Sequence, residues 1–247
     1  MLRPLLIWAA ALAWLGLSAC SESPPSAWEP VQTESTYRLL FNDALVAEVL
    51  FQLSIEPDGS YRIEAFTAPT GQMRKAGDHQ ILEVSSGTIA DGQIRPTRFD
   101  HSVLNGDSVE AVNLLFDWPG KTLTLLGSDE RRQVSLQPDT QDRLSYLLAA
   151  RTLARQGEGE RRLHVAASDA TEETLLQVIG REELELPLGR IEAVGIRRLS
   201  ADPGEERELW FADAITPLPL RVVRRRDGNA VEMQLETIVD RVQPASE

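Results

Sequence analysis

A change of hydrophobic period in the middle of the chain is the feature that most limits its fold. Over most of the sequence apolar and polar residues alternate, and these runs break at Gly, Pro, Asn and Asp. Only the segment from Gln137 to Gly157 has a long helical pattern. Alternation predicts half-buried strands, and a period of about 3.6 predicts an amphipathic helix. The sequence therefore predicts a mainly β protein with one long helix in mid-chain.

The predicted helix spans about Asp139 to Gln156. Asp139 is the expected N-cap, and Asp142 occupies the position that a capping box gives to Glu or Gln. Gly157 can end the helix. The apolar stripe consists of Leu144, Leu147 and Leu148, widened by Tyr146, Ala150, Leu153 and Ala154. Because this stripe must be buried, we expect the helix to cover or plug the sheet.

The flanking segments predict roughly a dozen strands joined mostly by short loops. Asn105-Gly106, between two alternating runs, is the strongest hairpin turn. Consecutive hairpins favour antiparallel neighbours, and a sheet of this length must curl, close or split. We therefore expect a large curled antiparallel sheet or a barrel-like β fold, with the helix packed on or in it. Whether the interior is a filled core or a lined cavity stays open.

The first residues have the features of a secretion signal. Arg3 supplies a positive start, and Leu5 to Leu17 form an apolar run too short to span a membrane. The expected organisation is a signal peptide at 1–19, a lipidated cysteine and Pro-rich tether at 20–33, a single β-rich domain at 34–242 and a disordered tail at 243–247.

The tetrad Leu17-Ser18-Ala19-Cys20 resembles the lipobox of bacterial lipoproteins. This resemblance implies diacylation of Cys20, cleavage before it and acylation of the new amino group. An ordinary signal peptide beside a chance cysteine is the alternative. By the sorting rule associated with lipoproteins, Ser21 rather than Asp implies delivery to the outer membrane. The expected location is the cell envelope, on the periplasmic face, with a lipid anchor.

The composition excludes several partners. The formal net charge is −13 and the pI about 4.8, so the surface should repel nucleic acid. Cys20 is the only cysteine, and its lipidation leaves no thiol for a disulfide, a metal or a nucleophile. The expected partners are the membrane, through Cys20, and an envelope protein, a lipid or a glycan.

The sequence contains no nucleophile elbow, phosphate-binding glycine loop or zinc helix. Its three histidines, His79, His101 and His164, lie in separate strands or loops, which favours structural or surface roles. No catalytic residue, metal ligand or cofactor is therefore predicted, and a non-catalytic protein is favoured.

Six residues are candidates for ligand binding: Asp117, Trp118, Asp142, Ser145, Arg221 and Arg224. Asp142 and Ser145 can orient a ligand or belong to the first turn of the helix. Arg221 and Arg224 belong to a basic cluster with Arg225 and Arg226, to which Arg197 and Arg198 can add. This cluster can bind a phosphate headgroup or a glycan, or can pair across strands with Glu232 and Glu236.

Several short motifs resemble, in order and spacing, the bacterial domain of unknown function 3108. They are Ser86-Gly87-Thr88-Ile89 with Gly92, Pro96 and Phe99, then Phe116-Asp117-Trp118 and Gln141-Asp142-Arg143-Leu144-Ser145, then Pro187-Leu188-Gly189, Trp210-Phe211-Ala212-Asp213 and Leu218-Pro219-Leu220. The match covers about Tyr37 to Val239. The resemblance implies an exported, β-rich protein and carries no established activity.

Three functions remain. The favoured interpretation is a non-catalytic, membrane-tethered binding or envelope-assembly module. The first alternative is a carrier or chaperone for lipid or another apolar ligand, and the second is an envelope hydrolase that uses carboxylates. An empty apolar cavity would favour the carrier, and two facing carboxylates in a polar cleft would favour the hydrolase.

Lipidation of Cys20 predicts that Cys20→Ala releases the protein from the membrane. Each buried acyl CH₂ contributes about 0.8 kcal/mol, so that several chains hold a protein stably. Fractionation of cells that express wild type and variant measures this. Unchanged membrane association of the variant would contradict a lipid anchor.

Overall fold

The computed structural model describes residues 28–71, 74, 79–106, 108–127, 130–167, 171–199 and 204–240. Within them, fifteen strands form one continuous sheet around helix α2 (Ser145–Gln156), which confirms the predicted fold class. The strands are β1 (Val31–Phe41), β2 (Ala44–Ile55), β3 (Ser60–Pro69), β4 (His79–Ala90), β5 (Gln93–Asn105), β6 (Ser108–Asp117), β7 (Thr122–Leu126), β8 (Arg131–Ser135), β9 (Thr140–Gln141), β10 (Glu160–Ala166), β11 (Thr171–Leu186), β12 (Gly189–Leu199), β13 (Glu205–Phe211), β14 (Arg221–Arg226) and β15 (Asn229–Asp240). The expected signal segment, Cys20 and the tail at 243–247 lie outside the described residues.

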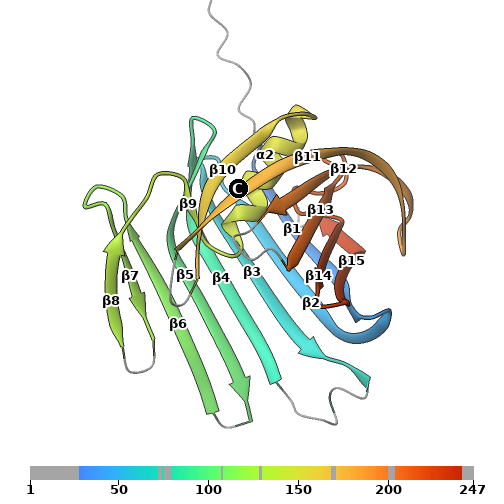
Figure 1. The fold of residues 1–247 in the computed structure, drawn as a ribbon, viewed down its shortest axis with the longest axis horizontal. Coiled ribbons are helices and arrows are strands. Elements are labelled where there is room, and N and C mark those ends of the chain that lie inside the picture. Colours follow the sequence, from blue (N-terminus) through green and yellow to red (C-terminus); the bar gives the residue numbers. More distant parts are fainter. Residues whose placement is uncertain are drawn as a thin grey trace, which may run out of the picture.

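The sheet consists of two meanders joined through the first and last strands. Its order is β8-β7-β6-β5-β4-β3-β2-β1-β15-β14-β13-β12-β11-β10-β9. The pairs are antiparallel except for β9 and β10, which are parallel. The second meander curls over α2 and faces the first (Figure 1). Among the described helices, none is long and apolar enough to cross a membrane.

Tight turns with unusual backbone angles make the long meanders possible. Both residues of Asn42-Asp43, Asp91-Gly92 and Asp227-Gly228 have positive φ angles. Two such residues define the type I′ turn, whose twist matches that of paired strands. Asn, Asp and Gly tolerate these angles best, which explains why they separate the alternating runs. The predicted hairpin at Asn105-Gly106 joins the paired strands β5 and β6, with Asn105 as the last residue of β5, paired with Ser108.

The helix begins later than its sequence predicts. Asp139, the expected N-cap, has a left-handed backbone with φ of 55° and precedes the short strand β9. The assignment of Asp139 as the cap was therefore wrong. The helix begins at Ser145, and Gly157 ends it with φ of 77° and an N–H donated to the carbonyl of Ala154.

Asp142 caps the turn that leads into α2. Its Oδ1 accepts the N–H groups of Leu144 and Ser145, both at 2.8 Å, while Ser145 Oγ accepts the N–H of Asp142 at 2.9 Å. Ser85 on β4 donates to Asp142 Oδ2 at 2.7 Å, and its hydroxyl lies 3.2 Å from that of Tyr61. This buried network fixes the start of the helix to the first meander. Burial raises the pKa of Asp142 to about 6, although these hydrogen bonds oppose the rise.

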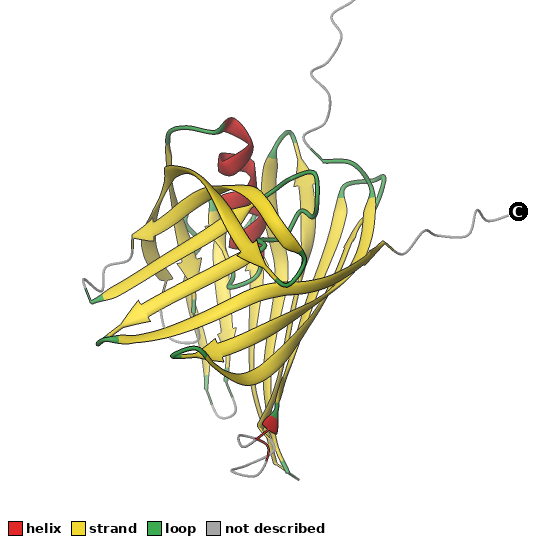
Figure 2. Cartoon of the chain, turned by 90° about the vertical axis from the view of Figure 1, so that its right-hand side faces the viewer, coloured by secondary structure: helices red, strands yellow, loops and turns green. Residues whose placement is uncertain are grey.

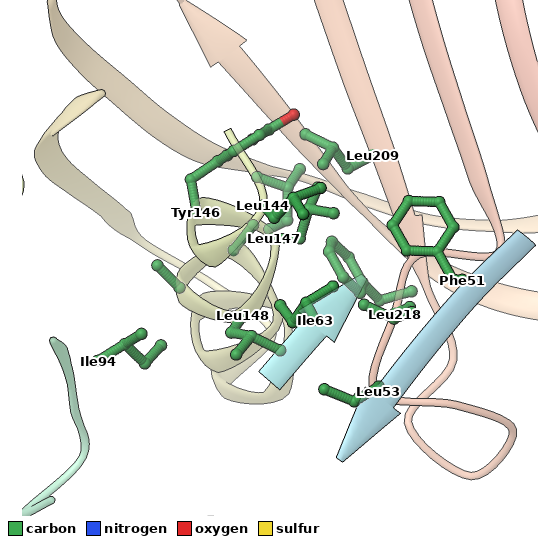
Figure 3. Close-up of a cluster of buried hydrophobic side chains, with 14 of the residues drawn as sticks. Phe51, Leu53, Ile63, Ile94, Leu144, Tyr146, Leu147, Leu148, Leu209 and Leu218 are labelled. Carbon is green, nitrogen blue, oxygen red and sulfur yellow. The ribbon is translucent and has the colours of Figure 1, made fainter. Parts of the chain in front are cut away.

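The helix lies inside the curled sheet rather than on its outer surface (Figure 2). Nine of its twelve residues are buried, so almost its whole circumference contacts protein. Figure 3 shows Leu144, Leu147 and Leu148 among side chains from both meanders, including Ile63 and Leu209. The space around the helix is therefore a packed core that joins the two halves.

Replacement of a core leucine of α2 should destabilise the whole fold. Leu147 is 5% exposed, and a Leu→Ala change at a buried site typically costs about 2–5 kcal/mol. We expect Leu147→Ala to lower the free energy of unfolding by about 3 kcal/mol in chemical denaturation. Gln156→Ala, an exposed change on the same helix, is the matched control. A loss below about 0.5 kcal/mol for Leu147→Ala would contradict the placement of the helix.

Asp142 should make stability depend on pH. In the unfolded chain an Asp carboxyl titrates near 3.8, and in the fold Asp142 titrates at about 6. Protonated Asp142 therefore stabilises the fold fully below the unfolded pKa of 3.8. As pH rises through the folded pKa of about 6, this contribution of roughly 3 kcal/mol to the free energy of unfolding is lost. Asp142→Asn keeps an oxygen acceptor for the helix N–H groups and cannot ionise.

We therefore expect Asp142→Asn to match the wild type near pH 4 and to unfold at higher denaturant concentration near pH 7.5. Denaturation series at several pH values measure the difference in the free energy of unfolding between the two proteins. The contributions of titratable groups that both proteins share cancel in this difference. Parallel stability curves for the two proteins would show that Asp142 does not titrate in this range.

Candidate functional site

An open cleft of about 580 Å³ lies between the two meanders. Strands β5 and β6 provide one wall with Phe99, His101, Val103, Glu110, Ala111, Val112 and Leu114. Arg143, Val165, Ala167, Glu172, Arg198, Glu205, Arg207 and Arg224 complete the lining, from the approach to α2 and from the second meander. The first wall is thus largely apolar, and the opposite wall carries most of the charge.

Three arginines form a row across three neighbouring strands of the second meander. Arg198 on β12 is directly opposite Arg207 on β13, which is directly opposite Arg224 on β14. Neighbouring strands are about 4.8 Å apart, so the row is roughly 10 Å long. Like charges directly opposite each other destabilise a sheet. The row therefore needs anions to balance it.

Glu205 balances one end of the row. One carboxylate oxygen accepts a hydrogen bond from Arg207 at 2.8 Å, and the other accepts one from Arg224 at 2.6 Å. Burial alone would raise the pKa of Glu205, but the hydrogen bond from Arg224 and the neighbouring positive charges hold it below its usual value. Glu205 is thus a carboxylate bridge between two guanidinium groups.

Arg198, at the other end, is buried with weak partners. Its side chain is only 8% exposed, and its nearest carboxylate oxygen, on Glu172, lies 3.4 Å from Nη2. The guanidinium lies 5.2 Å from the ring centre of Tyr146. In the described part of the chain, the Nε atoms of Arg198, Arg207 and Arg224 have no hydrogen-bond acceptor. A buried cation normally needs a close, hydrogen-bonded counter-charge, and among the described residues Arg198 has only the long contact to Glu172 and the more distant charge of Glu205.

The wall formed by the first meander holds a smaller charged group. Glu83 Oε1 lies 3.1 Å from Nδ1 of His101 and 3.2 Å from Nη1 of Arg143. Arg143 directly follows the capping residue Asp142, so the buried network at the helix start also positions Arg143 at the cleft. Each of these three side chains therefore already has a partner beside the cleft.

The six predicted site residues fall in different places. Of the six, only Arg224 lines the cleft between the meanders, called the arginine cleft below. Asp142 and Ser145 are buried where the chain enters α2. Asp117 accepts the N–H of Gly120 at 2.9 Å in the turn after β6. Trp118 donates its indole N–H to the carbonyl of Pro96 at 2.7 Å and lines a separate hollow of about 590 Å³.

Arg221 lies on the opposite face of the sheet from Arg224, because the two are three residues apart in one strand. It pairs with Glu232 through bonds of 2.6 and 3.1 Å, as the alternative of cross-strand pairing anticipated. Arg143, Arg207 and Glu205 were missed by the sequence analysis. The sequence did contain a signal that separates Arg221 from Arg224, because side chains alternate between the two faces along β14.

The described residues contain no group of three or more His, Cys, Asp and Glu side chains arranged to hold a metal ion. The three histidines lie apart, on β4, β5 and β10. His164 Nδ1 is 3.3 Å from the carbonyl of Pro138, and His101 belongs to the group around Glu83. Four of the residues that line the cleft are arginines: Arg143, Arg198, Arg207 and Arg224.

Comparison with solved structures gives the fold independent support. The crystal structure of a beta-barrel-like protein of domain of unknown function DUF1849 from Brucella abortus matches with a TM-score of 0.60 and 9% sequence identity. The match covers 86% of this chain and 99% of that chain. At this identity the likeness concerns the fold alone.

Comparison with curated proteins gives no match. The family model described as "Protein of unknown function (DUF3108)" matches residues 36–236, which is most of the chain and nearly the span that the sequence motifs indicated. The chain therefore belongs to the DUF3108 family.

Proposed function

We propose that this protein is a membrane-tethered, non-catalytic binding module of the bacterial cell envelope, and that it holds an anionic ligand or partner in the arginine cleft. The observation that carries this proposal is Arg198, a nine-tenths buried cation whose hydrogen-bonding contact to a carboxylate within the described residues, on Glu172, is long. Proteins keep such a costly arrangement where it serves binding rather than stability. A bound anion would supply the missing counter-charge.

Attachment of the first strand supports the tethered arrangement. Trp28 is 7% exposed, and the guanidinium of Arg151 on α2 lies 4.1 Å from its ring centre. Trp28 follows Cys20 by eight positions in the sequence, a reach of at most about 28 Å. An anchor at Cys20 would therefore hold this end of the domain near the membrane.

The cleft would then be accessible from the aqueous side. Strand pairing places Val31 level with Pro96 on β5. Val103, at the cleft, lies seven residues further along the same strand, roughly 23 Å away. The end that an anchor at Cys20 would hold lies toward the start of β5, and the cleft lies further along that strand, from Phe99 to Val103, which would leave the cleft free for a ligand.

The two alternatives receive less support. A carrier that encloses an apolar chain needs interior space, and the interior here is occupied by α2, whose Leu148, Ala149 and Ala150 are 0% exposed. A hydrolase needs two facing carboxylates free for chemistry, whereas Glu172 and Glu205 in the cleft lining lie in ion pairs, which leaves Glu110 as the one further carboxylate of the described lining. One part of the carrier hypothesis is still supported, because the apolar wall of the cleft can contact an apolar part of the ligand.

Retention of a ligand tests this function. We expect native mass spectrometry of the gently purified full-length protein to show a bound species that Arg198→Gln loses. Arg162→Gln is the matched control, because Arg162 is 67% exposed and pairs only with the exposed Glu173 in the described residues. Arg198→Gln should leave thermal stability unchanged or raise it, since it removes a poorly paired buried charge. Equal retention by wild type and Arg198→Gln would contradict the proposal.

A further inference from the structure

We propose that the group bound in the arginine cleft is the phosphate of an amphiphile, with the phosphate at Arg198 and Arg207 and the apolar part along β5 and β6. This inference rests on the proposed function and names the class of ligand. It begins from the difference between the two ends of the arginine row.

At one end of the row the protein supplies its own anion. Glu205 bridges Arg207 and Arg224, with one carboxylate oxygen for each guanidinium. Among the described residues, no carboxylate bridges Arg198 and Arg207 in the same way. The contact from Arg198 goes instead to Glu172 on β11, on the side away from Arg207. The gap between Arg198 and Arg207 is therefore where an external oxyanion finds unused donors.

The donors around this gap come from different directions. Arg198 and Arg207 extend from neighbouring strands, and Tyr146 comes from α2. The Tyr146 hydroxyl interacts with Arg207 and is among the groups that raise the pKa of Arg207 against the effect of burial. A tyrosine hydroxyl carries one hydrogen that it can donate to an oxyanion. Three donors that do not share a plane suit a tetrahedral phosphate better than a flat carboxylate, and the guanidinium fork matches phosphate oxygens.

The size of the cleft requires more than a phosphate. A water molecule occupies about 30 Å³, so a group of five heavy atoms fills only a part of about 580 Å³. The remaining lining on the facing wall is mostly apolar, with Phe99, Val103, Val112 and Leu114 on β5 and β6. A ligand that satisfies both walls has an anionic head and an apolar part.

Isothermal titration of the full-length protein, in a nonionic detergent, tests this with four probes. They are hexyl phosphate, inorganic phosphate, hexanoate and hexyltrimethylammonium. We expect hexyl phosphate to bind at least ten-fold more tightly than each of the other three. Arg198→Gln should weaken its binding at least ten-fold, and Arg162→Gln should leave it unchanged. Arg198→Lys keeps the charge without the fork and should also weaken binding, which preserves the test should the Gln variant fold poorly.

Each contrary result would overturn a definite part of this proposal. Equal affinity for inorganic phosphate would make free phosphate the ligand and remove the apolar part. Equal affinity for hexanoate would overturn the choice of phosphate while the proposed binding function stands. The protein could retain a native ligand in an Arg198-dependent way and still not bind hexyl phosphate. That result would overturn this inference alone. Absence of both would overturn this inference and the proposed function together.

Discussion

Burial of α2 between the two meanders is the interaction on which the rest of the structure depends. Curling exposes a concave apolar face, and the helix covers that face from within. Leu148, Ala149 and Ala150 of the helix are all 0% exposed. Because β5 and β10 to β13 contact the same helix, its diameter sets the separation of the two halves. The cleft is the part of the space between the two meanders that the helix does not fill.

The cleft owes its chemistry to strand register. Arg198, Arg207 and Arg224 would not meet if β12, β13 or β14 slipped by one residue, because a slip moves alternate side chains to the other face. Register here is fixed by the core, since Ile196 and Leu209 are also directly opposite each other and fully buried. The apolar contacts near the helix thus hold together a row of charges that would otherwise repel.

The sequence allowed prediction of the elements better than of their partners. The change of period identified the helix and its buried leucines, because both depend on local spacing. Its start was misplaced, because Thr140 and Gln141 pair with β10, more than twenty residues later. A local pattern cannot reveal a distant strand. For the same reason Arg224 was a candidate and Arg198 a possible addition to its basic cluster, while Arg207, which completes the row, and Glu205, which bridges two of its arginines, were not recognised.

The pairing of β1 with β15 has a consequence for how the molecule forms. Thr33 lies opposite Asp240, so partners about 200 residues apart must find each other before the two meanders join. Contacts between distant residues slow folding, because a long loop must close before they stabilise anything. Synthesis begins at the N-terminus, so β1 waits with one edge unpaired until the final strand is made. Each meander can form early from its hairpins, but the arginine cleft, which needs both, can exist only after this last strand has paired.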